Sequence, residues 1–461
     1  MSAPVVRGQA GLRPRTVSDV LVLVTVVLGV PALVVGMTAG SATVQLGVVA
    51  VLTAFVAGWV TTVHPRATLA AFALVLGLAP YAKLPGTGAP LILVLALGSW
   101  VALAFLPGAR IRPGWPEAAL ALVAGVALLS VLATSPSPKA LVEYAAWLAA
   151  TSVVVPMRFL TAPARRVVVD ALVGGAAVAA VVGVALLRLD PNGFFLARLS
   201  FVGYRPGADN AQYVPGTEQN ALRLTGTYVE PNVAGLVLAV ALLLAVAAYR
   251  GWLRVLLVVV IGAGLAMTLS RSALGTVVVA CGLVVLLSRS RQRWWLVGAG
   301  LVGSVGALAI PVLRERLLNS FGPHDTGSLA RELAFSDFAK SLDNHWIWGL
   351  GWDREEFRSQ AVGRTVNFVA NAPLLTIYRG GAILGLVVAV VLLVLVLRAV
   401  HASRGGFETA VLACGVAGFC LVALQLDFPV VIQHPATAVF SVLIGLSLGR
   451  PCTDDEREES R

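Results

Sequence analysis

Long apolar runs separated by short charged segments constrain this chain more than any other feature of its sequence. Hydrophobic residues make up 58% of the 461 residues, charged residues only 12%, and the mean hydropathy is +0.87. A soluble domain carries about 25% charged residues, so this chain lacks the polar surface that a soluble protein of its length needs. The pattern therefore predicts an all-α polytopic membrane protein.

The apolar runs are long enough to predict individual spans, because a helix needs about 20 apolar residues to cross the hydrocarbon core. We expect a bundle of about 12–14 transmembrane helices. The candidate runs are 20–37, 44–63, 68–82, 89–106, 117–133, 140–157, 167–187, 232–249, 253–269, 273–288, 294–313, 381–398, 408–424 and 435–449. The first run follows three arginines and resembles a signal-peptide start, which we interpret as a retained signal anchor.

The distribution of positive charge predicts the sidedness of these spans. When the N-terminus is placed in the cytoplasm and the spans alternate, most arginines of the short loops fall on the cytoplasmic side. The short loops on the opposite side hold only Lys83, Lys139 and Arg271. This is the bias that the positive-inside rule requires, so we expect both termini in the cytoplasm.

The same alternation divides the chain into membrane and extracytoplasmic parts. We expect an N-terminal transmembrane bundle (1–187), a first long extracytoplasmic loop (188–231), transmembrane helices (232–313), a second long extracytoplasmic loop (314–380), C-terminal transmembrane helices (381–449) and a cytoplasmic tail (450–461). In the second loop, the apolar spacing of residues 328–348 predicts an amphipathic helix. Such a helix lies on the membrane or forms a lid over a site.

Several classes of site have no signal in the sequence. There is no P-loop, no GxGxxG after a strand-like run and no His/Cys cluster at metal spacing, so we predict neither a metal nor another cofactor. Four cysteines rule out a disulfide scaffold. The net charge of +11 maps onto loops beside the membrane, which makes lipid a partner and gives no indication of nucleic acid.

Two arginines stand at predicted outer ends of helices. Arg223 closes the first long loop, just before Pro231 and Asn232, which suit a helix start. Residues 253–288 would form a helix about 54 Å long, against a core of about 30 Å. The run must therefore fold back, and the turn at 270–272 places Arg271 near the outer surface.

These two guanidinium groups suit one common ligand, a lipid that bears phosphate. Arg binds phosphate oxygens in a bidentate manner and keeps its charge, and two nearby helix N-termini would favour the same anion. Simpler interpretations stay open: Arg223 as an interfacial contact to lipid headgroups, and Arg271 as a snorkelling residue. Arg331 and Arg379, in the second loop, are further candidates for phosphate contact. The simpler alternatives are that Arg331 is solvated and that Arg379 anchors the chain at the interface.

Four segments resemble the O-antigen ligase and O-antigen polymerase family of bacterial envelope proteins. They are RLTGTYVEPNVAG at 223–235, TLSRSALG at 268–275, RELAFSDFAKSLDNHWIWGLGW at 331–352 and NFVANAPLLTIYRGGAILGL at 367–386, so the resemblance covers roughly 220–390.

The resemblance implies transfer of a saccharide from an undecaprenyl-diphosphate carrier to a hydroxyl of a glycan or lipid acceptor, at the outer face of a bacterial plasma membrane. It also implies that arginines matching Arg223 and Arg271 bind the diphosphate. Their positive charge stabilises this leaving group, so the reaction demands no metal.

The sequence departs from the family at the expected general base. The family often carries a His-Asn pair before the late span, where this chain has Ala370 and Asn371. Alanine cannot accept a proton, although Asn371 remains a candidate substrate contact. Among the outer histidines 324, 345 and 434, His345 is the best-placed replacement base, and a solvated or capping role for it stays open.

Two other functions compete with the enzyme. A flippase or transporter for lipid-linked glycans suits the number of spans, but ion-coupled carriers place acids mid-membrane, and the centres of these spans hold none. A non-catalytic partner in envelope assembly is consistent with Ala370.

Overall fold

The computed structural model describes residues 56–85, 88–134, 137–190, 194–204, 222–311, 314, 338–340, 342, 344–353, 372–423 and 434–449. The labelled α-helices are α4 (Pro65–Leu78), α5 (Leu91–Phe105), α6 (Trp115–Ala133), α7 (Pro138–Ser152), α8 (Val154–Arg158), α9 (Ala162–Leu189), α10 (Phe194–Ala197), α11 (Pro231–Ala248), α12 (Gly251–Met267), α13 (Arg271–Leu287), α14 (Arg293–Ala309), α17 (Ala372–Ala402), α18 (Phe407–Ala423) and α19 (His434–Leu448). Two 3₁₀ turns complete them, η2 (Ser200–Val202) and η4 (Gly226–Tyr228), and no strand occurs within these residues.

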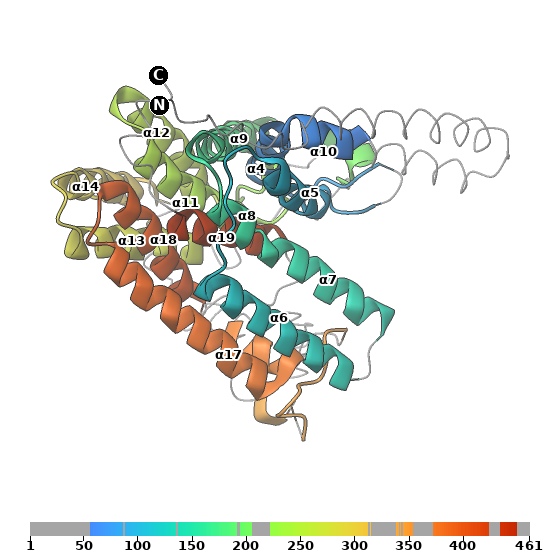
Figure 1. Cartoon of the computed structure of the whole chain (residues 1–461). Coiled ribbons are helices and arrows are strands. Elements are labelled where there is room, and N and C mark those ends of the chain that lie inside the picture. Colours follow the sequence, from blue (N-terminus) through green and yellow to red (C-terminus); the bar gives the residue numbers. More distant parts are fainter. Residues whose placement is uncertain are drawn as a thin grey trace, which may run out of the picture.

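The described helices confirm an all-α polytopic membrane protein (Figure 1). Five of them are long and apolar enough to cross a membrane, or six if the pair Val56–Val63 and Pro65–Leu78, bent by 113°, forms one span. Five shorter apolar helices fall on predicted spans as well: α5, α12, α13, α18 and α19. The two N-terminal predicted spans lie largely outside the described residues.

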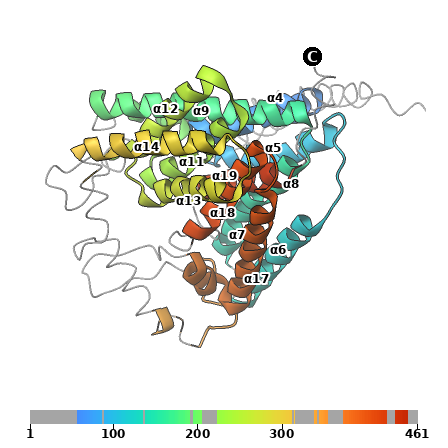
Figure 2. The same cartoon turned by 90° about the vertical axis from the view of Figure 1, so that its left-hand side faces the viewer.

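Helix α11 lies at the centre of the bundle, where α9, α12, α13, α18 and α19 pack around it (Figure 2). Inside the protein, 89% of its apolar window is buried. A helix that is apolar on all sides is expected to be surrounded, and the sequence of α11 holds only Asn232 as a strongly polar side chain. The central helix therefore begins at the segment that carries the first candidate arginine.

Contacts at the helix ends join segments that the predicted alternation assigns to the same side of the membrane. At one end, ion pairs join Arg158 to Glu117 and Arg165 to Glu408. At the other end, hydrogen bonds join Lys83 to Val202, Thr227 to Leu78 and Ser130 to Trp348. These contacts join helix ends within the described residues, while the sidedness derived from charge stays a prediction.

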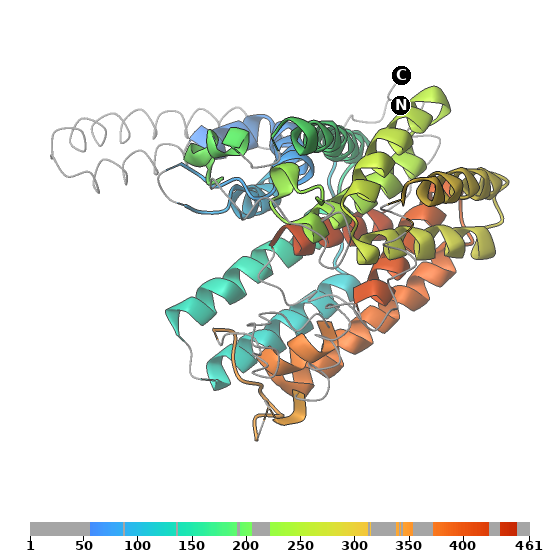
Figure 3. The same cartoon turned by 180° about the vertical axis from the view of Figure 1, so that it is seen from behind.

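Helices α6, α7 and α17 extend away from α4 and α9 (Figures 1 and 3), while α17 also packs against α18 and α7 against α19. Helix α17 begins at Ala372 and changes direction at Gly381, which has a φ of 77°. The sequence predicted a span starting at 381, which is where α17 kinks, and it did not predict the helical segment that precedes the kink. Arg379 consequently lies within α17 and is 1% exposed, rather than in a loop before the span.

The segment 344–353 docks on the break in α17. The backbone N–H groups of Leu350 and Gly351 donate to the carbonyls of Tyr378 and Arg379 at 2.7 and 3.2 Å. A Cβ added at Gly381 would stand 1.9 Å from the carbonyl oxygen of Ile347, so only glycine permits this approach. Residues 338–340 and 342 are helical and 346–348 form a turn, so the predicted amphipathic helix does not continue to residue 348.

We predict that Gly381→Ala lowers the free energy of unfolding by about 2 kcal/mol or more. The added methyl group meets a backbone carbonyl, and the φ of 77° is unfavourable for alanine. Thermal unfolding in lipid nanodiscs measures the effect. Gly298→Ala in α14, where a Cβ meets nothing within 4 Å, is the control, and equal melting temperatures for the two variants would contradict the docking.

Candidate functional site: an arginine-lined corner at two helix starts

Arg223 ties the end of the first long loop to two helices. Its Nε donates to the carbonyl of Thr268 at 2.9 Å, and a terminal N–H donates to Oδ1 of Asn232 at 2.9 Å. The adjacent backbone N–H of Leu224 donates to the carbonyl of Met267 at 2.8 Å. Arg223 is thus held between the first turn of α11 and the turn that joins α12 to α13.

The starts of α11 and α13 lie against each other. A Cβ added at Gly235 would stand 2.7 Å from Cβ of Ala273 and 2.9 Å from Cβ of Ser270, so the first turns of the two helices touch. Arg271 is the first residue of α13 and is half-buried. The chain therefore folds back at 268–270 as the length of the apolar run predicted, and both candidate arginines belong to one corner.

This arginine corner, made of Arg223, Arg271 and the first turns of α11 and α13, suits an anion. The N-terminus of a helix presents unpaired N–H groups and the positive end of the helix dipole, and Pro231 at the start of α11 removes only one such donor. Two guanidinium groups add full charges that bind phosphate oxygens in a bidentate manner. The corner therefore offers the groups that binding of a phosphate or diphosphate would use.

Backbone strain is concentrated at the same corner. Among the described residues, the non-glycine residues with positive φ are Val229, at 59°, and Leu269, at 52°. Val229 lies two residues before the start of α11, and Leu269 lies in the turn before α13. Positive φ is especially unfavourable for a β-branched residue, and strained backbone of this kind gathers at functional sites.

Two buried tyrosines hold the loop that carries Arg223. The hydroxyl of Tyr228 donates to the carbonyl of Gly77, and the hydroxyl of Tyr204 donates to the carbonyl of Thr227 at 2.8 Å. Burial raises the pKa of both phenols above the usual range, so they stay protonated and remain donors. The η4 turn is thereby fixed against α4 at the entry to the corner.

The remaining predicted site residues belong to other segments or lie outside the described part of the chain. His345 is exposed, and its backbone carbonyl accepts the N–H of Gly349 at 2.9 Å. Arg379 is buried in the first segment of α17. Residues with no described position are Arg331, Ala370, Asn371 and His324. Within the described residues, no group of three or more His, Cys, Asp or Glu is placed to hold a metal.

Sequence reasoning missed how Arg223 is held. Asn232 was interpreted only as a helix-start residue, whereas its side-chain oxygen also accepts a hydrogen bond from Arg223. The other acceptor is the main-chain carbonyl of residue 268, which leaves no trace in side-chain identity. The signal in the sequence that could have indicated this hydrogen bond was the nine-residue spacing of Arg223 and Asn232 across the η4 turn.

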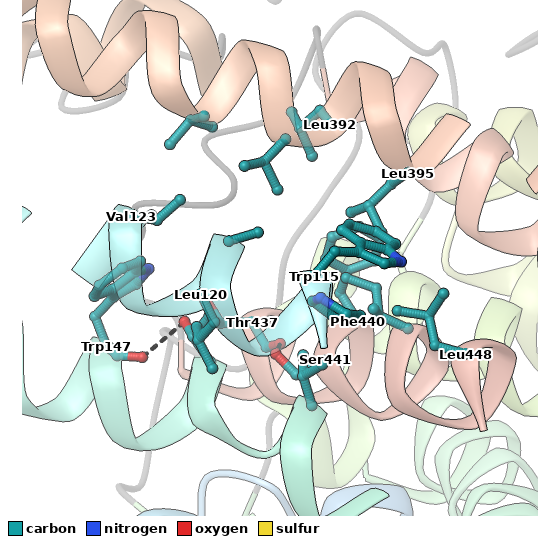
Figure 4. A pocket seen from close by; sticks show the side chains of 17 residues that line it. Trp115, Leu120, Val123, Trp147, Leu392, Leu395, Thr437, Phe440, Ser441 and Leu448 are labelled. Atoms are coloured by element: carbon teal, nitrogen blue, oxygen red, sulfur yellow. Dashed lines mark hydrogen bonds between the residues drawn. The ribbon is translucent and has the colours of Figure 1, made fainter. Parts of the chain in front are cut away.

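An apolar cavity lies among α6, α7, α17 and α19 (Figure 4). Its wall includes Trp115, Trp147, Leu392 and Phe440, and its polar residues are few: Thr151, Thr437 and Ser441. The hydroxyl of Thr151 donates to the carbonyl of Trp147 at 2.8 Å, which satisfies it within α7. A cavity of this composition between apolar helices can take a hydrocarbon chain.

The helical spans define a polytopic membrane protein, and the arginine corner is its candidate anion-binding site. A family model described as O-antigen ligase matches residues 256–372. This match supports an O-antigen ligase-like family and confirms the resemblance found in the sequence. The matched stretch includes Arg271 and His345, whereas Arg223 precedes it. No curated protein and no solved structure matches the chain.

We predict that Val229→Gly raises the free energy of unfolding by about 1 kcal/mol, because glycine adopts a φ of 59° without the steric cost that valine meets. Val229→Ala is the matched control, since alanine keeps most of that cost, and it should give no stabilisation. Thermal unfolding in nanodiscs measures both variants. A lower melting temperature for glycine than for alanine would contradict the assignment of strain.

Proposed function

We propose that the protein transfers a saccharide from a lipid diphosphate, of the undecaprenyl-diphosphate type, to a hydroxyl of a glycan or lipid acceptor. The reaction takes place at the outer face of a bacterial plasma membrane, with both chain termini in the cytoplasm. The single observation that carries the proposal is the convergence of Arg223 and the start of α13 on one corner. The family match over 256–372 supports the same class of reaction.

The chemistry is displacement at the anomeric carbon of the donor. The acceptor oxygen forms a new bond to that carbon while the bond from the carbon to the diphosphate oxygen breaks, and the acceptor proton passes to a base. Negative charge grows on the departing diphosphate, and groups already aimed at such charge lower the barrier. Arg223, Arg271 and the two helix starts are the groups that supply this stabilisation in the proposal.

We predict that Arg271→Ala and Arg223→Ala each lower turnover about 100-fold or more, because each removes a fixed positive charge beside the leaving group. The measurement is glycan transfer by the reconstituted protein with a lipid-diphosphate oligosaccharide donor. Arg271→Lys is the control that keeps the charge without the bidentate fork, and it should retain part of the activity. Melting temperatures separate a loss of chemistry from a loss of folding.

Unchanged turnover in both alanine variants would reject the arginine corner as the donor site. A flippase would instead move labelled lipid across liposomes without forming a glycosidic bond, and a non-catalytic assembly partner would do neither. Measuring translocation and transfer in the same proteoliposomes therefore separates the three functions.

His345, which is exposed in the segment that docks on α17, is the proposed general base that accepts the acceptor proton. We predict that His345→Ala lowers the maximal rate at least 10-fold with little change in melting temperature, because a surface imidazole contributes little to packing. The exposed His401 at the far end of α17 offers a matched control, His401→Ala. Wild-type turnover in His345→Ala would remove this histidine as the base.

A further inference from the structure

A cluster of aromatic side chains joins α7 to the segment that docks on α17, and the arginine corner does not use it. The ring of Trp352 lies 5.8 Å from that of Tyr144 and 5.5 Å from that of Trp147, at interplanar angles of 82° and 63°. Trp352 is 1% exposed. The hydroxyl of Tyr144 is satisfied, since it donates to the carbonyl of Ala124 at 2.9 Å.

Among the described residues, two buried polar atoms of this cluster have no hydrogen-bond partner: Oε2 of Glu143 and Nε1 of Trp352. Glu143 interacts electrostatically with Asp353, the residue that follows Trp352, so the two side chains lie in the same region of the structure. Buried polar atoms in folded proteins almost always have a partner, which can be a bound molecule. The pair therefore indicates a ligand for which the described residues supply no partner.

The chemistry of the two atoms restricts that ligand. A carboxylate oxygen only accepts hydrogen bonds, and an indole N–H only donates them. A cation could satisfy Glu143 but not Trp352, and a phosphate could satisfy Trp352 but not Glu143. A hydroxyl both donates and accepts, so hydroxyl groups are the simplest ligand groups that satisfy both atoms.

Charged side chains surround Glu143 and differ in exposure. Arg379, Lys139 and Asp353 all act electrostatically on Glu143. Lys139 is exposed, Glu143 and Asp353 are half-buried, and Trp352 is 1% exposed. Polar side chains of this region therefore reach the surface, while the indole lies inside the protein.

We propose that Glu143 and Trp352 form a saccharide-binding subsite in which sugar hydroxyls donate to the carboxylate and accept from the indole N–H. The subsite rests on the proposed function in one respect, since it would hold the glycan acceptor of the transfer reaction. A carboxylate and an indole N–H supply the acceptor and the donor that neighbouring sugar hydroxyls require.

Saturation-transfer NMR on the full chain in nanodiscs tests the subsite. The probes are the methyl glycosides of glucose, galactose, mannose and N-acetylglucosamine at millimolar concentration, with sorbitol as the acyclic control. We expect saturable transfer to at least one glycoside and none to sorbitol. Trp352→Phe, which removes the donor and keeps an aromatic ring, and Glu143→Gln should each raise the dissociation constant at least 10-fold.

Trp348→Phe is the matched control, because Trp348 lies in the same segment and is 37% exposed; it should bind as wild type does. Melting temperatures identify any variant that fails to fold, and Glu143→Gln keeps the shape of the side chain. The proposal is overturned if no glycoside binds to the wild type. It is equally overturned if both variants bind as wild type does, the result expected when water alone satisfies the two atoms.

Glycan transfer measured on the same preparations separates this proposal from the proposed function. Glycoside binding that depends on Glu143 and Trp352, without any transfer by wild type, would leave a saccharide-binding protein and reject the enzyme. Transfer by wild type that is unaffected in both variants would reject the subsite and keep the enzyme.

Discussion

The hydrogen bonds of Arg223 hold together the part of the structure on which the proposed chemistry depends. One bond ends on a main-chain carbonyl in the turn before α13, and the other on the side chain of Asn232 at the start of α11. Hydrogen bonds from a charged donor are stronger than neutral ones, the more so in a low-dielectric environment. A single side chain thus sets where the long loop, the central helix and the fold-back turn meet.

At α17, a close approach between two backbone segments holds the structure together. The segment 344–353 lies against α17 because Gly381 has no side chain and adopts a φ of 77°. That contact brings Trp352 to Tyr144 and Trp147 on α7. Trp147 also lines the apolar cavity, so the aromatic cluster and the cavity share a wall.

Hydropathy was sufficient to predict the helical class and the break between helices before Arg271, because bilayer thickness restricts helix length directly. It could not predict that α17 begins at Ala372, since a short helix with Arg379 inside it resembles an interfacial loop in hydropathy. The burial of Arg379 depends on contacts with α6 and the docked segment, which have no local pattern.

The candidate site was predictable in part, for a similar reason. Arg223 and Arg271 stood out as charges beside apolar runs, and the structure brings their segments together. The strain at Val229 and Leu269 and the unpaired atoms of Glu143 and Trp352 arise only from tertiary packing. A sequence reports which groups are present, but pairing and backbone strain depend on neighbours that are distant along the chain.

The burial of α11 has a consequence for how the protein responds to its lipid environment. A helix exposed to acyl chains tilts or shifts when bilayer thickness changes, whereas 89% of the α11 window is enclosed by other helices. Neighbouring helices therefore set the position of α11 along the membrane normal. A change in bilayer thickness acts on α11 only by moving those helices. Arg223 is bonded to the start of α11 and to the turn before α13, so its position relative to α13 should change little with membrane composition.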